Sequence, residues 1–231
     1  DLPDFGLYLA TVFAGLQGQG EVARQAAGLQ LKTHLNRTLT KSPLSPAALG
    51  CIQNAAVTAL HDSNVAIQKT AGSIITTLVQ KAGIISCRHV LERLDELLGN
   101  TDPSLVEASF SALNKVCEDG TAGLDKLLEK SPAGAECFLN WCMDRLFPKV
   151  FECASLGGQA FTRRRAIECL NHFVLNGIFN NGKYPLLQPL ERRYVEVLGT
   201  LAADDDVSVL RDVCRGLCCV IENGWNTLNA E

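Results

Sequence analysis

EVARQAAGLQLKTHL, residues Glu21–Leu35, is the stretch of the sequence that decides the fold. Four later stretches repeat its pattern of apolar residues: Asn64–Val79, Ser104–Cys117, Phe161–Leu175 and Val207–Ile221. The five copies align on one position, occupied in turn by Arg24, Gln68, Glu107, Arg163 and Leu210. Three residues later every copy is apolar, and seven and ten residues later four of the five are apolar. This spacing is typical of one face of an α-helix.

The distance between the copies predicts how the helices are organised. They recur every 39 to 56 residues, which leaves room for a partner helix before each copy. Apolar stripes at helical spacing mark these partners near residues 5–16, 46–60, 87–98, 139–153 and 187–201. One amphipathic pair cannot bury its apolar face alone, whereas a stack of pairs can. The sequence therefore predicts an all-α fold, an α-α superhelix of about five repeats over residues 1–38, 39–83, 84–119, 120–180 and 181–231.

Turn and capping residues separate the predicted helices. Gly18–Gly20 ends the first helix, and Pro46 suits the first turn of another. Asp62–Asn64 and Asp204–Asp206 precede repeat copies and are predicted to cap them. Pro148 predicts a kink. Only residues 119–135 break the rhythm, and a short extra helix is expected there over residues 124–130.

Composition excludes several classes of protein. A hydrophobic content of 47% argues against disorder, and no apolar stretch is long enough to cross a membrane. The net charge of −4 gives no support to nucleic-acid binding. The ten cysteines lie within the helical patterns, on or beside the apolar stripes, which favours reduced thiols and an intracellular compartment. The N-terminus has neither a methionine nor a basic leader and looks like a cut within a longer protein.

The sequence offers no constellation of catalytic or metal-binding residues, so no enzyme, cofactor or metal is predicted. Gly18–Ala23 fits a loose dinucleotide fingerprint, but a helix precedes it instead of the required strand. Cys214, Cys218 and Cys219 lack the second pair that a zinc site needs. The aspartates at 204–206 suit a helix N-terminus better than a cation loop. Arg163–Arg165 is expected to be solvated or to pair with a neighbouring repeat.

Several stretches of the sequence resemble a known family. Glu21–Lys32 is similar to a helix of the second HEAT repeat in the importin-β (karyopherin-β) family of nuclear transport receptors. Ala71–Leu78 and Ala112–Asp119 resemble the transportin branch of that family, as do Asn171–Phe173 and Val213–Leu217. The resemblance covers the whole chain as HEAT repeats two to six of a longer solenoid. Among the departures are Thr33, Cys87 and Arg88, and the replacement of the HEAT arginine by Gln68, Glu107 and Leu210.

The resemblance implies a nuclear import receptor that shuttles between cytoplasm and nucleus. Such receptors release cargo when a Ran-type GTPase binds in its GTP state, and they bind cargo proteins and nucleoporins through the full-length chain. The second helix of each N-terminal repeat holds the GTPase, so polar residues on these helices are the candidate contacts. They are Lys32, Arg37, Lys69, Asn114, Glu118 and Asp119, and Lys32 has the strongest basis because its family counterpart faces the GTPase.

Two other functions stay open at this point. A HEAT scaffold subunit that organises a protein complex is the first, although such scaffolds have more uniform repeats near 39 residues. An enzyme with a helical-repeat core is the second, and the lack of any catalytic constellation argues against it.

Overall fold

The computed structural model describes residues 4–15, 18, 20–83, 85–155, 159–179 and 187–222. These residues form helices and turns with no β-strand among them, which confirms the predicted all-α class. The chain divides into two compact units, Asp1–Val116 and Cys117–Glu231, and each is described by itself. Leu16 and Gln19, which the sequence places in the first stripe and turn, lie outside the described residues. The division into five repeats stays a prediction.

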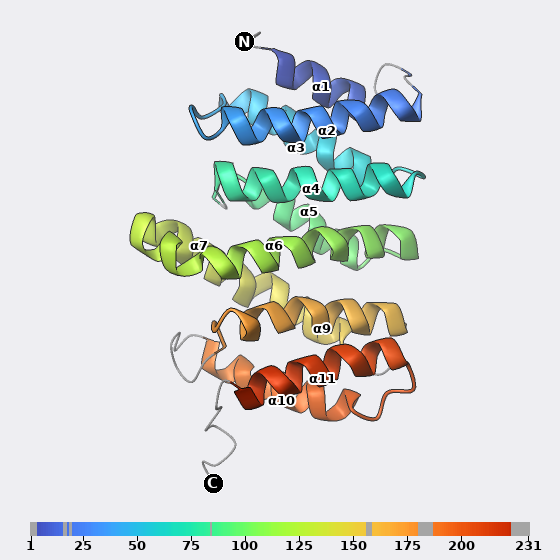
Figure 1. Ribbon diagram of the computed structural model, residues 1–231, viewed down its shortest axis with the longest axis vertical. Helices are drawn as coiled ribbons and strands as arrows, with labels where there is room; N and C mark the ends of the chain where they lie inside the picture. The colour runs from blue at the N-terminus through green and yellow to red at the C-terminus, as the bar shows by residue number, and fades with distance from the viewer. Residues whose placement is uncertain are drawn as a thin grey trace. The chain divides into compact units, whose positions relative to one another are not determined.

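The described part of the first unit is a stack of helix pairs. Its helices are α1 (Phe5–Phe13), α2 (Glu21–Thr38), α3 (Pro46–Leu60), α4 (Val65–Ala82), α5 (Arg88–Leu98) and the first part of α6 (Pro103–Lys130). Helices α2 and α4 pack side by side in one layer, and α1 and α3 pack behind them (Figure 1). The repeated stretches of the sequence thus form one face of the unit, and their partner helices form the other.

The predicted turn chemistry is present in the first unit. Gly18 has a φ of 70°, which glycine adopts readily, and Gly20 precedes α2 with an extended backbone. Ser45 caps α3 because its hydroxyl oxygen accepts a hydrogen bond from the Ala48 amide at 3.2 Å, and Pro46 is the first helical residue. These local signals place the ends of α1, α2 and α3 close to where the sequence predicts them.

Aliphatic residues and two glycines set the packing of the first unit. Leu31, Leu35 and Ile75 are fully buried, and each contributes about 1.5–3 kcal/mol by leaving water. A Cβ atom on Gly28 would lie 2.5 Å from the Phe13 ring, so only glycine lets α1 approach α2 this closely. At the same register position in α4, a Cβ on Gly72 would meet Ala112 at an ordinary 3.5 Å. The two glycines therefore differ in how tightly the neighbouring helix constrains them.

The described part of the second unit has an aromatic core. It contains the rest of α6, α7 (Pro132–Trp141), a π-helical turn η1 (Cys142–Leu146), α8 (Phe147–Cys153), α9 (Ala160–Leu175), α10 (Gln188–Leu201) and α11 (Val207–Glu222). Helices α9 and α11 pack against each other, with α8 against α9 and α10 against α11. Phe147, Phe173, Phe179 and Tyr194 are fully buried, and their ring centroids lie 4.8–6.0 Å apart.

Residues 124–130 are helical as expected, but the prediction that they form a separate short helix is wrong. Helix α6 continues without interruption to Lys130 and passes through Gly120 and Gly123. Glycine costs a helix about 1 kcal/mol relative to alanine, but tertiary packing outweighs that cost here. A Cβ atom on Gly120 would lie 2.8 Å from the Phe138 ring, so this glycine lets α7 approach α6. The chain first leaves the helix at Ser131.

Pro148 disturbs its helix one turn earlier than its own position. A proline in a helix clashes with the carbonyl four residues before it, here that of Asp144. The backbone is π-helical over Cys142–Leu146, which widens the turn around that carbonyl. Proline then occupies the first turn of α8, where a missing amide proton costs little.

An arginine connects each of two repeated helices to the turn before the next one. Arg24 of α2 forms an ion pair with Asp62, and Arg163 of α9 donates two hydrogen bonds to Asp204, at 2.6 and 2.9 Å. The Asp204 side chain is fully buried. Its Oδ1 also accepts the Asp206 amide at 2.9 Å, so of the three aspartates Asp206 caps α11 while Asp204 joins the repeats. Pairing with Arg163 holds the pKa of Asp204 below its usual value.

The thiols are only partly buried. All ten cysteines are free, and Cys87, Cys117, Cys142, Cys169 and Cys219 are buried as expected. Cys51 and Cys214 are exposed, so their expected place on or beside the apolar stripes does not give them burial, and Cys218 is exposed as well. Burial raises the pKa of Cys87 to about 11, although a hydrogen bond from Gln53 partly opposes that rise. No helix within the described ranges is long and apolar enough to cross a bilayer.

Candidate protein-binding surface

A shallow groove of about 220 Å³ runs between α2 and α4, on the layer formed by the repeated helices. Lys32 from α2 and Lys69 from α4 both line it, and Leu29 lies between them with half of its surface exposed. The remaining lining residues are small or neutral: Gln25, Ala66, Thr70 and Ser73. The structure therefore brings together two of the six predicted contact residues in one groove.

Helical geometry places both lysines beside the core instead of in it. Lys32 follows the fully buried Leu31, and Lys69 follows the buried Gln68. A step of one residue turns a side chain about 100° around the helix axis, away from the apolar stripe. Lys32 is half-buried and Lys69 is exposed. The aliphatic part of Lys32 is thus held against the protein while its ammonium group can reach solvent or a partner.

Arg37 lies near the C-terminal end of α2, on a different face of the helix from Lys32. It lines a second cavity of about 210 Å³ with Phe5 and His34, whose rings meet edge to face at 5.5 Å. Phe5 and Tyr8 of α1 are 39% and 59% exposed, so the outer face of α1 is apolar and open. This cavity shares no described lining residue with the α2–α4 groove, so Arg37 does not join Lys32 and Lys69 there.

The other predicted residues do not join this groove. Asn114 lies half-buried on α6 in the first unit, and its Oδ1 is buried without a hydrogen bond from the described residues. Glu118 and Asp119 belong to the second unit, and both take part in further polar interactions. Lys32 and Lys69 are therefore the members of the predicted set that line one groove together, whereas Arg37 lines a separate cavity.

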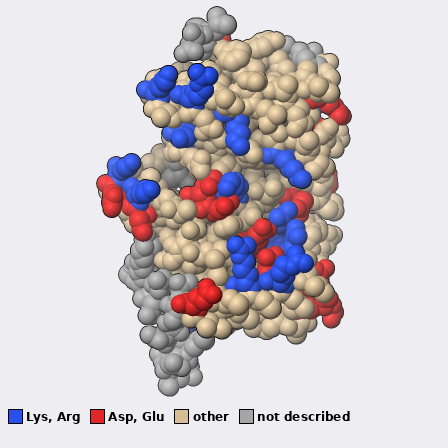
Figure 2. All heavy atoms as spheres, viewed as in Figure 1, with Lys and Arg blue, Asp and Glu red and all other residues tan. Residues whose placement is uncertain are grey.

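Charge along the sequence carries a signal that motif searching missed. Between Val22 and Gly83 the only acidic residue is Asp62, which is paired with Arg24. The other cations of this segment make no ion pair within the described residues: Lys32, Arg37, Lys41, Lys69 and Lys81. Figure 2 shows basic side chains with no acidic ones among them over the C-terminal part of α2 and the adjoining end of α4. Lys41 and Lys81 could have been found by counting charges within this segment.

The second unit has a mixed surface instead. Arg163 pairs with Asp204, Arg165 with Glu168 and Lys149 with Glu152. The sequence prediction of an ion pair from the Arg163–Arg165 run to a neighbouring repeat is confirmed by the Arg163–Asp204 pair. No group of three or more histidine, cysteine or acidic residues suited to a metal ion occurs within the parts of the chain that the structure describes.

Comparison with known proteins shows what the chain is similar to. No family model matches the chain. Transportin-1 of Mus musculus is 27% identical over 220 residues, and importin subunit beta-2 of Schizosaccharomyces pombe is 28% identical over 222 residues. These matches cover 95% and 96% of the chain but only 22% and 23% of the relatives. The chain therefore spans less than a quarter of the length of these two proteins.

Solved structures agree on the fold. Yeast importin-β (Kap95p) superimposes with a TM-score of 0.72 at 18% identity, over 98% of this chain and 26% of that one. The same score and identity apply to importin-β in the Kap95:Nup1 complex. Together, the sequence matches over nearly all of the chain and the shared arrangement of stacked helix pairs show that this chain is similar to the transportins and has the fold of importin-β.

Proposed function

We propose that this chain is the part of a nuclear import receptor that binds a Ran-type GTPase in its GTP state. The observation that carries the proposal is the α2–α4 groove, which Lys32 and Lys69 both line and which has no acidic residue among its described lining residues. A groove with two ammonium groups and an exposed leucine suits a protein surface that combines carboxylates with an apolar side chain. The similarity to transportin supports a Ran-type GTPase as that partner.

Binding at this groove is expected to be steered by charge. The ammonium groups of Lys32 and Lys69 attract an acidic surface over distances of about 8–10 Å at ordinary ionic strength. Once docked, a carboxylate between Lys32 and Lys69 loses water and forms charge-assisted hydrogen bonds. The GTPase would release cargo by binding this part of the receptor. Cargo proteins and nucleoporins are proposed partners of the whole receptor, which would shuttle between cytoplasm and nucleus.

The experiment compares the affinity of the chain for the GTP-loaded and the GDP-loaded GTPase by biolayer interferometry. An import receptor is expected to prefer the GTP form by at least about tenfold, which corresponds to 1.4 kcal/mol. A scaffold subunit has no reason to distinguish the two nucleotide states. Equal affinity for both forms, or no binding to either, would remove the GTPase assignment.

A further inference from the structure

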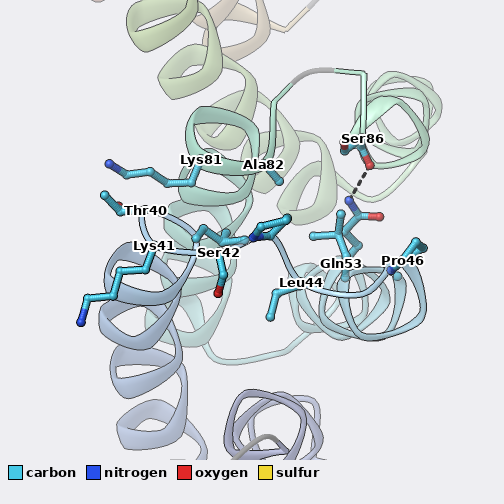
Figure 3. Close-up of a pocket in the computed structure, with 13 residues that line it drawn as sticks. Thr40, Lys41, Ser42, Leu44, Pro46, Gln53, Lys81, Ala82 and Ser86 are labelled. Carbon is cyan, nitrogen blue, oxygen red and sulfur yellow. Dashed lines mark hydrogen bonds between the residues drawn. The ribbon is translucent and has the colours of Figure 1, made fainter. Parts of the chain in front are cut away.

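A larger cavity lies at the C-terminal ends of α2 and α4. It has a volume of about 500 Å³ and is formed by the turn after α2, the first two turns of α3 and the end of α4 (Figure 3). Leu39, Leu44 and Leu49 line it together with two prolines. This size lies within the range of about 300–1,000 Å³ that is usual for ligand pockets.

The far wall of the cavity is fixed by a buried amide. Gln53 donates from Nε2 to the carbonyl oxygen of Ser86 at 2.8 Å, and the same nitrogen lies 3.4 Å from the Cys87 Sγ. Gln53 is only 5% exposed. The hydrogen bond therefore ties α3 to the segment before α5 and keeps the cavity open between them.

The rim of the cavity is basic. Lys41 and Lys81 are both exposed, and in Figure 3 their side chains extend to one side of the cavity, while Pro46 and Gln53 lie on the other. The smaller cavity that holds Arg37 shares Lys41 and Ser42 with this one, so the two are continuous. None of the described residues lining either cavity is acidic.

Helix α3 adds positive potential of its own. The N-terminal end of a helix carries a partial positive charge, and α3 begins at Pro46, on the wall of the cavity. The cavity thus combines an apolar floor with a positive helix end and three cations that have no ion-pair partner among the described residues. The larger cavity has no aromatic lining residue on which a nucleic-acid base could stack.

We propose that this cavity binds an extended acidic peptide segment of a partner protein. One leucine-like or phenylalanine-like side chain of the peptide fills the space beside Leu44, and flanking carboxylates pair with Lys41, Lys81 and Arg37. The apolar floor selects a peptide with a hydrophobic anchor, and the unpaired cations select acidic neighbours for it. This site is separate from the Lys32–Lys69 groove and does not depend on GTPase binding.

The test uses three fluorescein-labelled nonapeptides and measures fluorescence anisotropy with the whole chain. The first peptide has a central leucine flanked by four acidic residues on each side, the second has serine at the centre, and the third has lysine in place of every acidic residue. The leucine peptide is expected to bind at least about fivefold more tightly than the serine peptide, because a buried apolar side chain adds to the charge attraction. The lysine peptide is not expected to bind.

Charge reversals locate the site. Lys41→Glu with Lys81→Glu is expected to weaken binding of the leucine peptide by at least about tenfold. The control is Lys126→Glu with Lys130→Glu, which makes the same charge change at exposed positions of α6 and is expected to alter binding by less than about twofold. Circular dichroism and the urea midpoint confirm that both variants fold. Equal losses in the two variants would mean general charge attraction and would overturn the proposal.

The leucine anchor is tested by Leu44→Ser, at a half-buried position of the turn. This change is expected to weaken binding of the leucine peptide by about fivefold and to leave the affinity of the serine peptide unchanged. The reason is that only the leucine peptide places an apolar group in the cavity. A loss shared by both peptides, or by neither, would contradict binding in the cavity. Neither Leu44→Ser nor the Lys41→Glu/Lys81→Glu change is expected to alter GTPase affinity at the α2–α4 groove by more than about threefold, so failure of one proposal can be told from failure of the other.

Discussion

The turn before α4 and the turn before α11 are built in the same way, although they belong to different units. In each, an aspartate accepts hydrogen bonds from an arginine of the previous repeated helix and from an amide two residues later. The residue at that later position then caps the new helix: Asn64 caps α4 and Asp206 caps α11. One short polar motif therefore joins neighbouring repeats and also starts the next helix.

The turn before α6 shows what happens when the charges are absent. Gln68 replaces the arginine and Asn100 replaces the aspartate, so both partners of the ion pair become neutral. Gln68 donates instead to the Ser104 hydroxyl and the Asp62 carbonyl, at 3.1 and 2.8 Å, and Asn100 still accepts the Asp102 amide. The capping geometry thus survives the loss of the ion pair. The motif therefore stabilises the fold. Of the cations in this segment of the first unit it uses only Arg24, so the cations without an ion pair among the described residues are available for binding.

The two ion pairs are expected to differ in their contribution to stability. Asp204 is fully buried and receives two hydrogen bonds from Arg163, whereas Asp62 is 10% exposed and receives one from Arg24. Asp204→Asn should lower the free energy of unfolding by about 3 kcal/mol, and Asp62→Asn by about 1 kcal/mol. Urea unfolding at pH 7 measures both. Equal losses would show that burial and the second hydrogen bond do not matter.

Acid should remove the Asp204 contribution selectively. Its pKa is lowered in the folded chain by the hydrogen bonds from Arg163, so its stabilising effect is complete above the unfolded pKa of about 3.9. As pH falls through the lower folded pKa, the carboxylate becomes protonated and this stabilisation is lost. The stability gap between the wild type and Asp204→Asn should therefore shrink below about pH 4. A gap that stays constant down to pH 2 would contradict this origin.

Two glycines test how closely the helices of the first unit approach. Gly28→Ala should destabilise by about 2 kcal/mol, because its Cβ would lie 2.5 Å from Phe13 and 2.8 Å from Thr70. Gly72→Ala is the matched control, since its Cβ meets Ala112 at 3.5 Å and alanine favours a helix by about 1 kcal/mol. Its stability should stay within about 1 kcal/mol of the wild type. Thermal unfolding measures the stability of both variants. A loss of stability in Gly72→Ala as large as that in Gly28→Ala would contradict the packing argument.

Thiol reactivity gives the smallest effect but samples both units. A disulfide reagent should react quickly with Cys51 in the first unit and with Cys214 and Cys218 in the second, because these side chains are exposed. Cys87 and Cys142 should react only on unfolding, since burial raises the pKa of each thiol. Mass spectrometry after a short pulse identifies the labelled residues. Fast labelling of Cys142 in the native chain would show that the second unit opens readily.

Helix positions could be predicted from the sequence because apolar residues recur with the helical period. The α3 boundaries, Pro46–Leu60, match the prediction, because Ser45 and Pro46 are local start signals. The C-terminal boundary of α6 does not match the prediction, because the helix is extended by packing of the Phe138 ring of α7 against Gly120, a contact that no local pattern shows. The same limit applies to binding. Lys32 and Lys69 were predicted singly, but the cavity with Lys41 and Lys81 depends on tertiary packing that no local pattern encodes.

The most direct test of the account is a matched pair of charge reversals, measured for affinity to the GTP-loaded GTPase. Lys32→Glu with Lys69→Glu changes the α2–α4 groove, and Arg211→Glu with Arg215→Glu makes the same charge change at exposed positions of α11. The account predicts that the first pair weakens binding by about 1–3 kcal/mol, while the second changes it by less than about 0.5 kcal/mol. Equal weakening by both pairs, or no weakening by the first in a folded chain, would contradict the claim that this basic groove is the binding surface.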